Sequence, residues 1–165
     1  MWRFNQLLGA EFISVGSNTG IGEYCYLTAW KIGKSSTSEP SINIGSHCSI
    51  GAHNHITASN KIVIGDGFLS GKWVTITDNS HGNYDLNSFI DVNEWMKSTP
   101  IKRPIVSKGP VIIGCNVWVG DKVTILPSVH IGDGVIIGAN SLVTKDIPSY
   151  TIVDGNPAVV IKHLH

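Results

Sequence analysis

The 165-residue sequence has few charged residues, few cysteines and no long apolar run. Lysine and arginine number 12, aspartate and glutamate also number 12, and the formal net charge is therefore zero. A chain that binds nucleic acid or an anionic membrane as its main partner needs a basic patch, so this balance argues against both. No segment approaches the roughly 20 apolar residues of a membrane span, and the N-terminus lacks a secretory leader pattern. We therefore expect a cytoplasmic chain without membrane insertion.

The three cysteines are an odd number and do not suggest a disulfide framework. Cys25 and Cys48 occupy the same place in two similar six-residue segments, a place where a small inward-facing residue is expected. We interpret both as core residues rather than as nucleophiles. The length predicts about one domain, and the hydrophobic content of 42% is enough to fill a continuous core.

What the sequence does contain is a six-residue repeat over residues 113–142. Each six-residue unit, which we call a word, begins with a branched apolar residue, the opener, and glycine usually follows it. The openers are Ile113, Val119, Ile125, Ile131 and Ile137, followed by Val143. A helix does not return to phase every six residues, so this period indicates a parallel β-helix of stacked short strands. Similar words begin upstream at Val15, Ile21, Ile44, Ile50 and Ile64, so the predicted solenoid covers most of the chain.

The repeat stops between about residues 79 and 110. A loop of this length inside a compact domain is uncommon and usually functional or disordered, and its aromatic and apolar content favours an ordered arm. Such an arm must pack on the outside of the solenoid or on a neighbouring subunit, and we favour the neighbour. The predicted organisation is one domain over 1–165. It has solenoid segments over 13–78 and 111–147, an extended loop over 79–110, and a C-terminal cap over 148–165.

Three motifs, in a fixed order, carry a family resemblance. They are Thr-Asp-Asn-Ser-His at 77–81, Ile-Gly-Cys-Asn-Val-Trp-Val-Gly at 113–120, and 143–148 together with 155–162. With these motifs the chain resembles the hexapeptide-repeat acyltransferases, in particular the acetyl-CoA-dependent O-acetyltransferases of sugars, polysaccharides and some antibiotics. The resemblance implies an all-β fold, a left-handed parallel β-helix of triangular section. It also implies a homotrimer with three active sites between adjacent subunits.

The same resemblance implies that His81, at the start of the loop, is the catalytic base. Acetyl transfer from a thioester to a hydroxyl requires removal of the hydroxyl proton, and histidine, with an unperturbed pKa of about 6.5, suits this task. A positioned general base contributes about 10²–10⁴ in rate. We expect direct transfer in a ternary complex, with the oxyanion held by a donor fixed in the scaffold. Asp78 is expected to hold the other ring nitrogen of His81 or the acceptor.

Acetyl-CoA is the donor that the resemblance implies, and six positions match the family's donor groove. They are Trp118 and Gly120 near the thioester, Ala139 along the pantetheine arm, and Thr144, Lys145 and Lys162 towards the nucleotide. The two lysines are chemically suited to phosphate. Val159 stands where some relatives carry an arginine, so nucleotide contacts are expected to be weaker or supplied elsewhere.

The acceptor stays open. The polar residues expected to bind it are Asp78, Asn79, Tyr84 and Asp85. In galactoside and maltose acetyltransferases, acceptor-binding Asn and Asp residues precede the catalytic histidine, whereas alignment on residues 64–66 places Gly51 and Ser59 there. We therefore expect another acceptor, a glycan or its lipid-linked precursor, ahead of an antibiotic. N-acylation of an amino-sugar is a close rival, because fold cannot separate O- from N-acylation.

Two further classes share the solenoid. The γ-type carbonic anhydrases bind a metal through three histidines from adjacent subunits, which makes His47, His53, His55 and His81 relevant. The motifs around Trp118 favour the acyltransferase interpretation, and no metal is expected. A non-catalytic solenoid such as an ice-binding surface would carry threonines in register, and here they are scattered.

Overall fold

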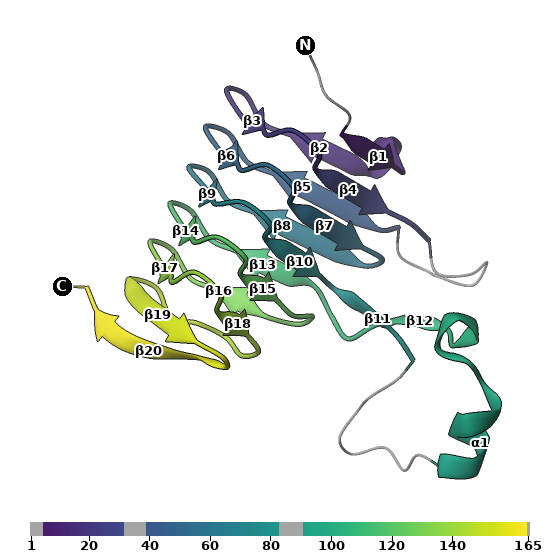
Figure 1. The fold of residues 1–165 in the computed structure, drawn as a ribbon. Coiled ribbons are helices and arrows are strands. Elements are labelled where there is room, and N and C mark those ends of the chain that lie inside the picture. Colours follow the sequence, from purple (N-terminus) through teal and green to yellow (C-terminus); the bar gives the residue numbers. More distant parts are fainter. Residues whose placement is uncertain (1–4, 32–38, 83–90, 165) are drawn as a thin grey trace.

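The computed structural model describes residues 5–31, 39–82 and 91–164. The chain winds as a parallel β-helix whose coils run from the purple N-terminal end to the yellow C-terminal end in Figure 1. Each word pairs with the third word after it, as Ile113 does with Ile131 and Val119 with Ile137. The predicted β-solenoid is therefore confirmed.

The solenoid has three flat faces, which we call A, B and C. Face A consists of β1 (Gln6–Leu8), β4 (Tyr26–Ala29), β7 (His55–Ala58), β10 (Thr75–Thr77), β15 (Thr124–Ile125) and β18 (Leu142–Val143). Face B consists of β2 (Ile13–Val15), β5 (Ser41–Ile44), β8 (Lys61–Ile64), β13 (Val111–Ile113) and β16 (His130–Ile131). Face C consists of β3 (Gly20–Ile21), β6 (Ser49–Ile50), β9 (Leu69–Ser70), β14 (Trp118–Val119), β17 (Ile136–Ile137), β19 (Thr151–Gly155) and β20 (Ala158–His163).

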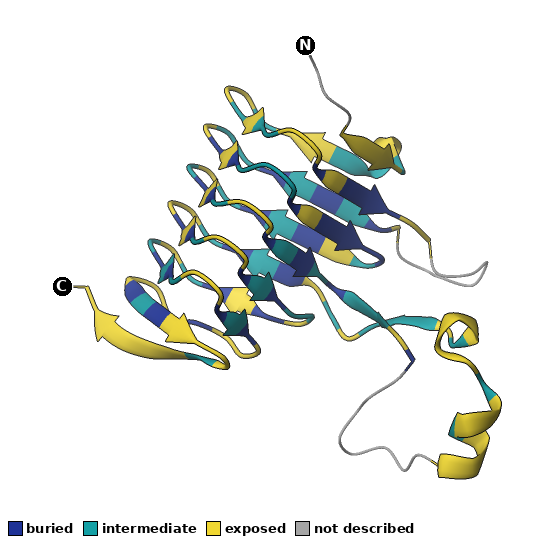
Figure 2. Ribbon diagram, viewed as in Figure 1, coloured by how far each residue is buried: buried dark blue, intermediate teal, exposed yellow. Residues whose placement is uncertain are grey.

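The three corners between the faces are called AB, BC and CA, in the direction of the chain. A short 3₁₀ helix, η1 (Ala10–Phe12), forms the first AB corner. The first described strand, β1, begins at Gln6 and pairs with β4. At the other end β19 continues the stacking of face C, and β20 pairs with it in antiparallel direction as an exposed edge strand (Figure 2).

The core is a column of side chains that point inward from all three faces. The word openers Ile113, Ile125 and Ile137 are almost fully buried, and so are Cys25 and Cys48, as predicted. The Sγ atom of Cys25 donates to the carbonyl oxygen of Gly51 at 3.1 Å, and burial raises the pKa of this thiol. These cysteines therefore fill the interior and are not poised as nucleophiles.

Glycine recurs in the second place of the words because successive coils approach too closely for a side chain. A Cβ atom added to Gly65 would lie 2.6 Å from the carbonyl carbon of Gly114, and one added to Gly120 would lie 2.7 Å from the backbone nitrogen of Ala139. Both distances are shorter than real Cβ contacts allow. Glycine recurs in the repeat because of the close spacing of the coils as well as the conformation of their turns.

Residues 79–107, which we call the arm, leave the solenoid after β10. The arm contains β11 (Asn79–His81), α1 (Val92–Lys97), η2 (Pro100–Lys102) and β12 (Ile105–Ser107), with 83–90 outside the described residues. Strands β11 and β12 pair in antiparallel direction, and Figure 1 shows the arm projecting away from the coils. None of the described helices is long and apolar enough to span a membrane.

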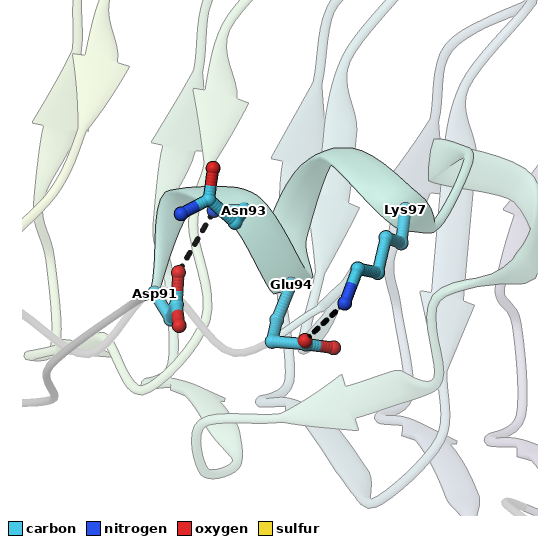
Figure 3. A network of polar contacts seen from close by, with 4 residues as sticks. All are labelled: Asp91, Asn93, Glu94 and Lys97. Carbon is cyan, nitrogen blue, oxygen red and sulfur yellow. Dashed lines mark hydrogen bonds and ion pairs between the residues drawn. The ribbon is translucent and has the colours of Figure 1, made fainter.

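Helix α1 is short and is held by local contacts. The Asp91 carboxylate accepts a hydrogen bond from the backbone N–H of Asn93 at 2.8 Å, which caps the first turn, and Lys97 pairs with Glu94 (Figure 3). None of its residues is buried within the chain. The large apolar side chains of the arm, Met96 and Ile101, are 75% and 80% exposed. The arm therefore presents apolar surface that its own solenoid does not cover.

Candidate active site

His81 lies at the end of β11, just where the arm leaves the solenoid. Its backbone is fixed by pairing with Ile105 of β12, and its side chain is exposed. Within residues 5–31, 39–82 and 91–164, no hydrogen bond or ring contact of the imidazole is found. Both ring nitrogens are thus free of described partners, and the side chain can meet a substrate hydroxyl without first losing an internal contact.

A cluster of three residues holds the arm beside His81. Gly82 has a φ of +93°, and its backbone N–H donates to the carbonyl oxygen of Pro104 at 2.7 Å. A Cβ atom on Gly82 would lie 3.0 Å from the Trp95 ring and 3.4 Å from Cδ of Arg103. The Arg103 guanidinium lies 3.7 Å from the centroid of the Trp95 ring, a cation–π geometry. These contacts set the direction in which the arm continues from His81.

Asp78 is fully buried at corner AB and anchors the neighbouring coil. One carboxylate oxygen accepts from the backbone N–H and the hydroxyl of Ser59, at 2.8 and 3.2 Å. The other accepts from the backbone N–H groups of Asn60 and Lys61, at 2.8 and 2.7 Å. No hydrogen bond joins Asp78 to His81 in the described part of the chain. The carboxylate thus stabilises a turn and does not orient the imidazole here.

Asn79 is half-buried and is also tied to the scaffold. Its side-chain amide donates to Oδ1 of Asp78 at 3.0 Å and to the carbonyl oxygen of Thr57 at 3.3 Å. The amide oxygen keeps the capacity to accept from a ligand. The other two residues expected to bind the acceptor, Tyr84 and Asp85, lie outside the described residues.

The positions expected near the thioester lie on face C and corner CA. Trp118, on β14, is 51% exposed on the outside of face C, while Gly120 and Ala139 are adjacent at corner CA. The need for glycine at position 120 follows from coil stacking alone, whether or not a ligand binds there. Successive pairings place Trp118, Ile136, Ile152 and Lys162 in one row across face C. The cation Lys162 thus lies three strands, or roughly 14 Å, from the indole.

Thr144 and Lys145 lie at corner AB, on another edge of the solenoid. They follow β18, which continues the row of β10 and β15, so Lys145 stands two strands, or roughly 10 Å, from Asp78. Both residues are exposed. Neither Lys145 nor Lys162 has an ion-pair partner among the described residues, so both ammonium groups can bind phosphate.

The structure therefore divides the predicted site residues into two groups on one chain. Thr144 and Lys145 lie at corner AB, and His81 lies on the arm that leaves this corner, whereas Trp118, Gly120, Ala139 and Lys162 lie on face C or corner CA. Face A separates the two groups. One subunit alone does not bring the predicted base close to the thioester end of the predicted donor groove.

The four histidines that suggested a metal site are also dispersed. His47 lies at corner BC, His53 at corner CA, His55 on face A and His81 on the arm. Among the described residues, no group of three or more histidine, cysteine, aspartate or glutamate side chains is arranged to hold a metal ion.

Sequence reasoning missed the three residues around His81. Gly82, Trp95 and Arg103 are separated along the chain and follow no repeat, so no pattern links them. A glycine directly after the histidine was the available signal, because a residue with positive φ is expected where the chain turns sharply.

Comparison with known proteins identifies the solenoid. The family described as "Bacterial transferase hexapeptide (six repeats)" matches residues 110–145. The crystal structure of a maltose O-acetyltransferase from Clostridium difficile 630 is 30% identical, with a TM-score of 0.60, over 94% of this chain and 72% of that one. The chain belongs to the hexapeptide-repeat acyltransferase family. Its fold, the left-handed parallel β-helix predicted from the sequence, is confirmed.

Two further proteins are also similar to this chain. The acetyltransferase VCA0836 from Vibrio cholerae, solved with acetyl-CoA, is 25% identical with a TM-score of 0.69, covering 94% of this chain and 73% of its own. The Escherichia coli protein described as the putative lipopolysaccharide biosynthesis O-acetyl transferase WbbJ is 39% identical over 108 residues, 66% of this chain. The chain spans about half of the length of WbbJ and less of the next curated relatives.

Proposed function

We propose that the chain transfers an acetyl group from acetyl-CoA to a hydroxyl of a sugar or a polysaccharide precursor. The observation that carries this proposal is the exposed imidazole of His81, which has no partner among the described residues and lies on a strand paired with β12 where the solenoid repeat is interrupted. Acetyl-CoA in the related VCA0836 structure and the description of WbbJ as an O-acetyl transferase support the donor and the acceptor class.

In the proposed mechanism, a ring nitrogen of His81 accepts the proton of the acceptor hydroxyl as its oxygen attacks the thioester carbonyl carbon. The oxyanion that results is held by a backbone N–H of a neighbouring coil. When the carbon–sulfur bond breaks, the imidazolium returns its proton to the sulfur, which leaves an acetyl ester and CoA. His81 ends in its starting state, and no acyl-enzyme is formed.

The exposed residues of the donor groove fit this substrate. Lys145 and Lys162, which have no ion-pair partners in the described part of the chain, offer ammonium groups for the CoA phosphates, and Trp118 offers an exposed indole for the thioester end. Asn79, with Tyr84 and Asp85 of the arm, would contact the acceptor. Asp78 is assigned to the scaffold, since its carboxylate already accepts hydrogen bonds at both oxygens.

We further propose that the active unit is a homotrimer with its sites between subunits. The separation of His81 from Trp118 across face A supports this, because a neighbour can bring its face C to the arm. The exposed apolar side chains Val92, Met96 and Ile101 on the arm provide a surface for such a contact. Each site then takes its base from one subunit and part of its donor groove from the next.

The test of this function is the variant His81→Ala. We expect unchanged acetyl-CoA binding in calorimetric titration, an unchanged mass in solution, and a turnover with glycan acceptors lowered by at least about 10². His130→Ala, which removes an exposed histidine on face B, serves as the control. Equal turnover in the His81 variant would remove the base from the mechanism.

A further inference from the structure

Three rings from successive coils form a continuous stack at corner CA. The ring centroids of Tyr24 and His53 are 5.1 Å apart, and those of His53 and Trp73 are 4.0 Å apart, with interplanar angles of 10° and 5°. We call these three residues the aromatic stack. Trp73 forms its last ring, because the next coil places Lys122 at the same corner, and 54% of Trp73 is exposed.

The backbone conformation of the aromatic stack is costly for such large residues. Tyr24, His53 and Trp73 have φ values of +59°, +62° and +62°. The left-handed region costs an ordinary residue roughly 1–2 kcal/mol, and Asn140 occupies the same kind of position two coils further on. Lys122, on the coil between them, also has a positive φ of +57°, so the turn itself does not require an aromatic residue. The distinctive feature of Trp73 is therefore its stacked and exposed ring.

The surroundings of Trp73 favour a saccharide over a protein partner. The exposed residues next to it are Lys72, Asp121 and Lys122, and Oδ1 of Asp121 accepts from the backbone N–H of Lys72 at 2.8 Å. The cores of protein interfaces are depleted in lysine and aspartate. An exposed indole with charged hydrogen-bonding groups nearby instead suits a pyranose ring, whose C–H face packs on the indole and whose hydroxyls bind these groups.

Trp73 and the arm stand at opposite ends of one strand. Trp73 precedes β10 at corner CA, and Asp78 follows β10 at corner AB, roughly 17 Å away at about 3.3 Å per residue. Because Ile76 points into the core, Thr75 and Thr77 point outward between them. His55, on the adjacent strand β7, lies beside Thr75. Thr75, Thr77 and His55 thus form a polar strip on face A, which we call the saccharide lane. It runs from the aromatic stack to the corner where the arm with His81 begins, over a length greater than one sugar ring.

We propose that this lane binds an extended saccharide, with Trp73 stacked on a pyranose remote from the one that is acetylated at His81. The inference rests on the proposed function for the His81 end and names the acceptor class, an oligosaccharide or polysaccharide. The two stacked rings behind Trp73 fix the indole in place, so little conformational entropy is lost when the sugar binds.

Saturation-transfer NMR with defined glycans tests the proposal. The probes are hexasaccharides of glucose, galactose and N-acetylglucosamine, together with the three monosaccharides. The variants are Trp73→Asn, which removes the ring and tolerates positive φ, Trp73→Tyr, which keeps a ring, and Trp30→Ala, which removes an exposed tryptophan outside the aromatic stack. We expect transfer from aromatic protons to at least one hexasaccharide in the wild type, in Trp73→Tyr and in Trp30→Ala. We expect at least tenfold weaker binding in Trp73→Asn.

Acetyl-CoA titration of the same samples separates the two proposals. If acetyl-CoA binds but no hexasaccharide does, or if Trp73→Asn binds the hexasaccharide as the wild type does, the saccharide lane is wrong and the acetyl transfer stands. If the hexasaccharide binds through Trp73 but acetyl-CoA does not bind, the proposed saccharide site is supported and the proposed acetyl transfer is wrong. Monosaccharide binding that weakens equally in Trp73→Asn would place the acetylated sugar at Trp73 and overturn the extended lane.

Discussion

The position of a residue is determined in different ways in the solenoid and in the arm. In the solenoid, a residue's role follows from its place in a word: the opener is buried, the second place is close to another backbone, and the next coil repeats the arrangement. In the arm, no place repeats, no helix residue is buried, and position depends on single contacts such as the Trp95–Arg103 pair. Regular stacking thus supplies stability, while the interruption supplies the exposed His81, the proposed base.

The junction between the two regions should give the largest effect on stability. Asp78→Ala leaves the backbone N–H groups of residues 59–61, one buried and two partly buried, without their acceptor, so we expect a loss of about 3 kcal/mol in the free energy of unfolding. Urea denaturation measures it. The control Asp66→Ala removes an exposed carboxylate that accepts from one backbone N–H, that of Ser46, and should cost about 1 kcal/mol. Equal losses in the two variants would contradict the anchoring role of Asp78.

The arm should respond in turnover instead of stability. Gly82→Ala forces a side chain against the Trp95 ring at a φ of +93°, which shifts the arm beside His81. We expect kcat to fall by about 10–100-fold, since small displacements of a catalytic group have effects of this size. The midpoint of thermal unfolding should change little. Gly20→Ala, where a Cβ meets no atom within 4 Å, is the matched control. Full activity in Gly82→Ala would show that the arm does not position the base.

A charge at the solenoid corner should affect only donor affinity. Lys145→Ala removes one unpaired ammonium group, and we expect a Kd for acetyl-CoA about tenfold higher, near 1.4 kcal/mol, with kcat unchanged. Lys61→Ala removes the same charge from face B and should leave the Kd unchanged. A loss confined to kcat would place Lys145 outside the donor groove.

The smallest expected effect is a pH dependence confined to face A. Partial burial lowers the pKa of His55, so the unfolded chain binds a proton more readily than the folded chain does. The contribution of neutral His55 to the free energy of unfolding is therefore fully present above the ordinary histidine pKa of about 6.5. It is lost as the pH falls through the lower pKa of His55 in the folded chain. His55→Gln should reduce this fall in urea denaturation between pH 7.5 and 5. Identical slopes in the wild type and in His55→Gln would contradict the assignment.

The same contrast explains what the sequence could predict. Interior positions such as Cys25 and Ile125 were predictable because the word fixes which way a side chain points. The aromatic stack was not, because Tyr24, His53 and Trp73 are brought together by coils of unequal length along the chain. The backbone contacts of Asp78 were not predictable for a similar reason, since its partners belong to the preceding coil and precede it by many residues.

The sequence predicted the parts of the candidate site that a break in the repeat marks, but not those that depend on contacts within the arm. His81 marks the interruption of the repeat, which any reading of the words finds. The antiparallel pairing of β11 with β12, and the packing of Arg103 on Trp95, depend on contacts within an irregular segment. Nor could the words reveal that Lys145 and Trp118 lie at different edges, since that depends on how the faces close into a triangle.

The strands before the arm pair with the strands after it, so the insertion does not interrupt the stacking of the coils. Strand β8 pairs with β13, and β10 pairs with β15, in the register of the uninterrupted coils. Lengthening an insertion at this corner adds a closure entropy that grows only with the logarithm of its length. Evolution can therefore exchange the whole arm while every coil is inherited unchanged.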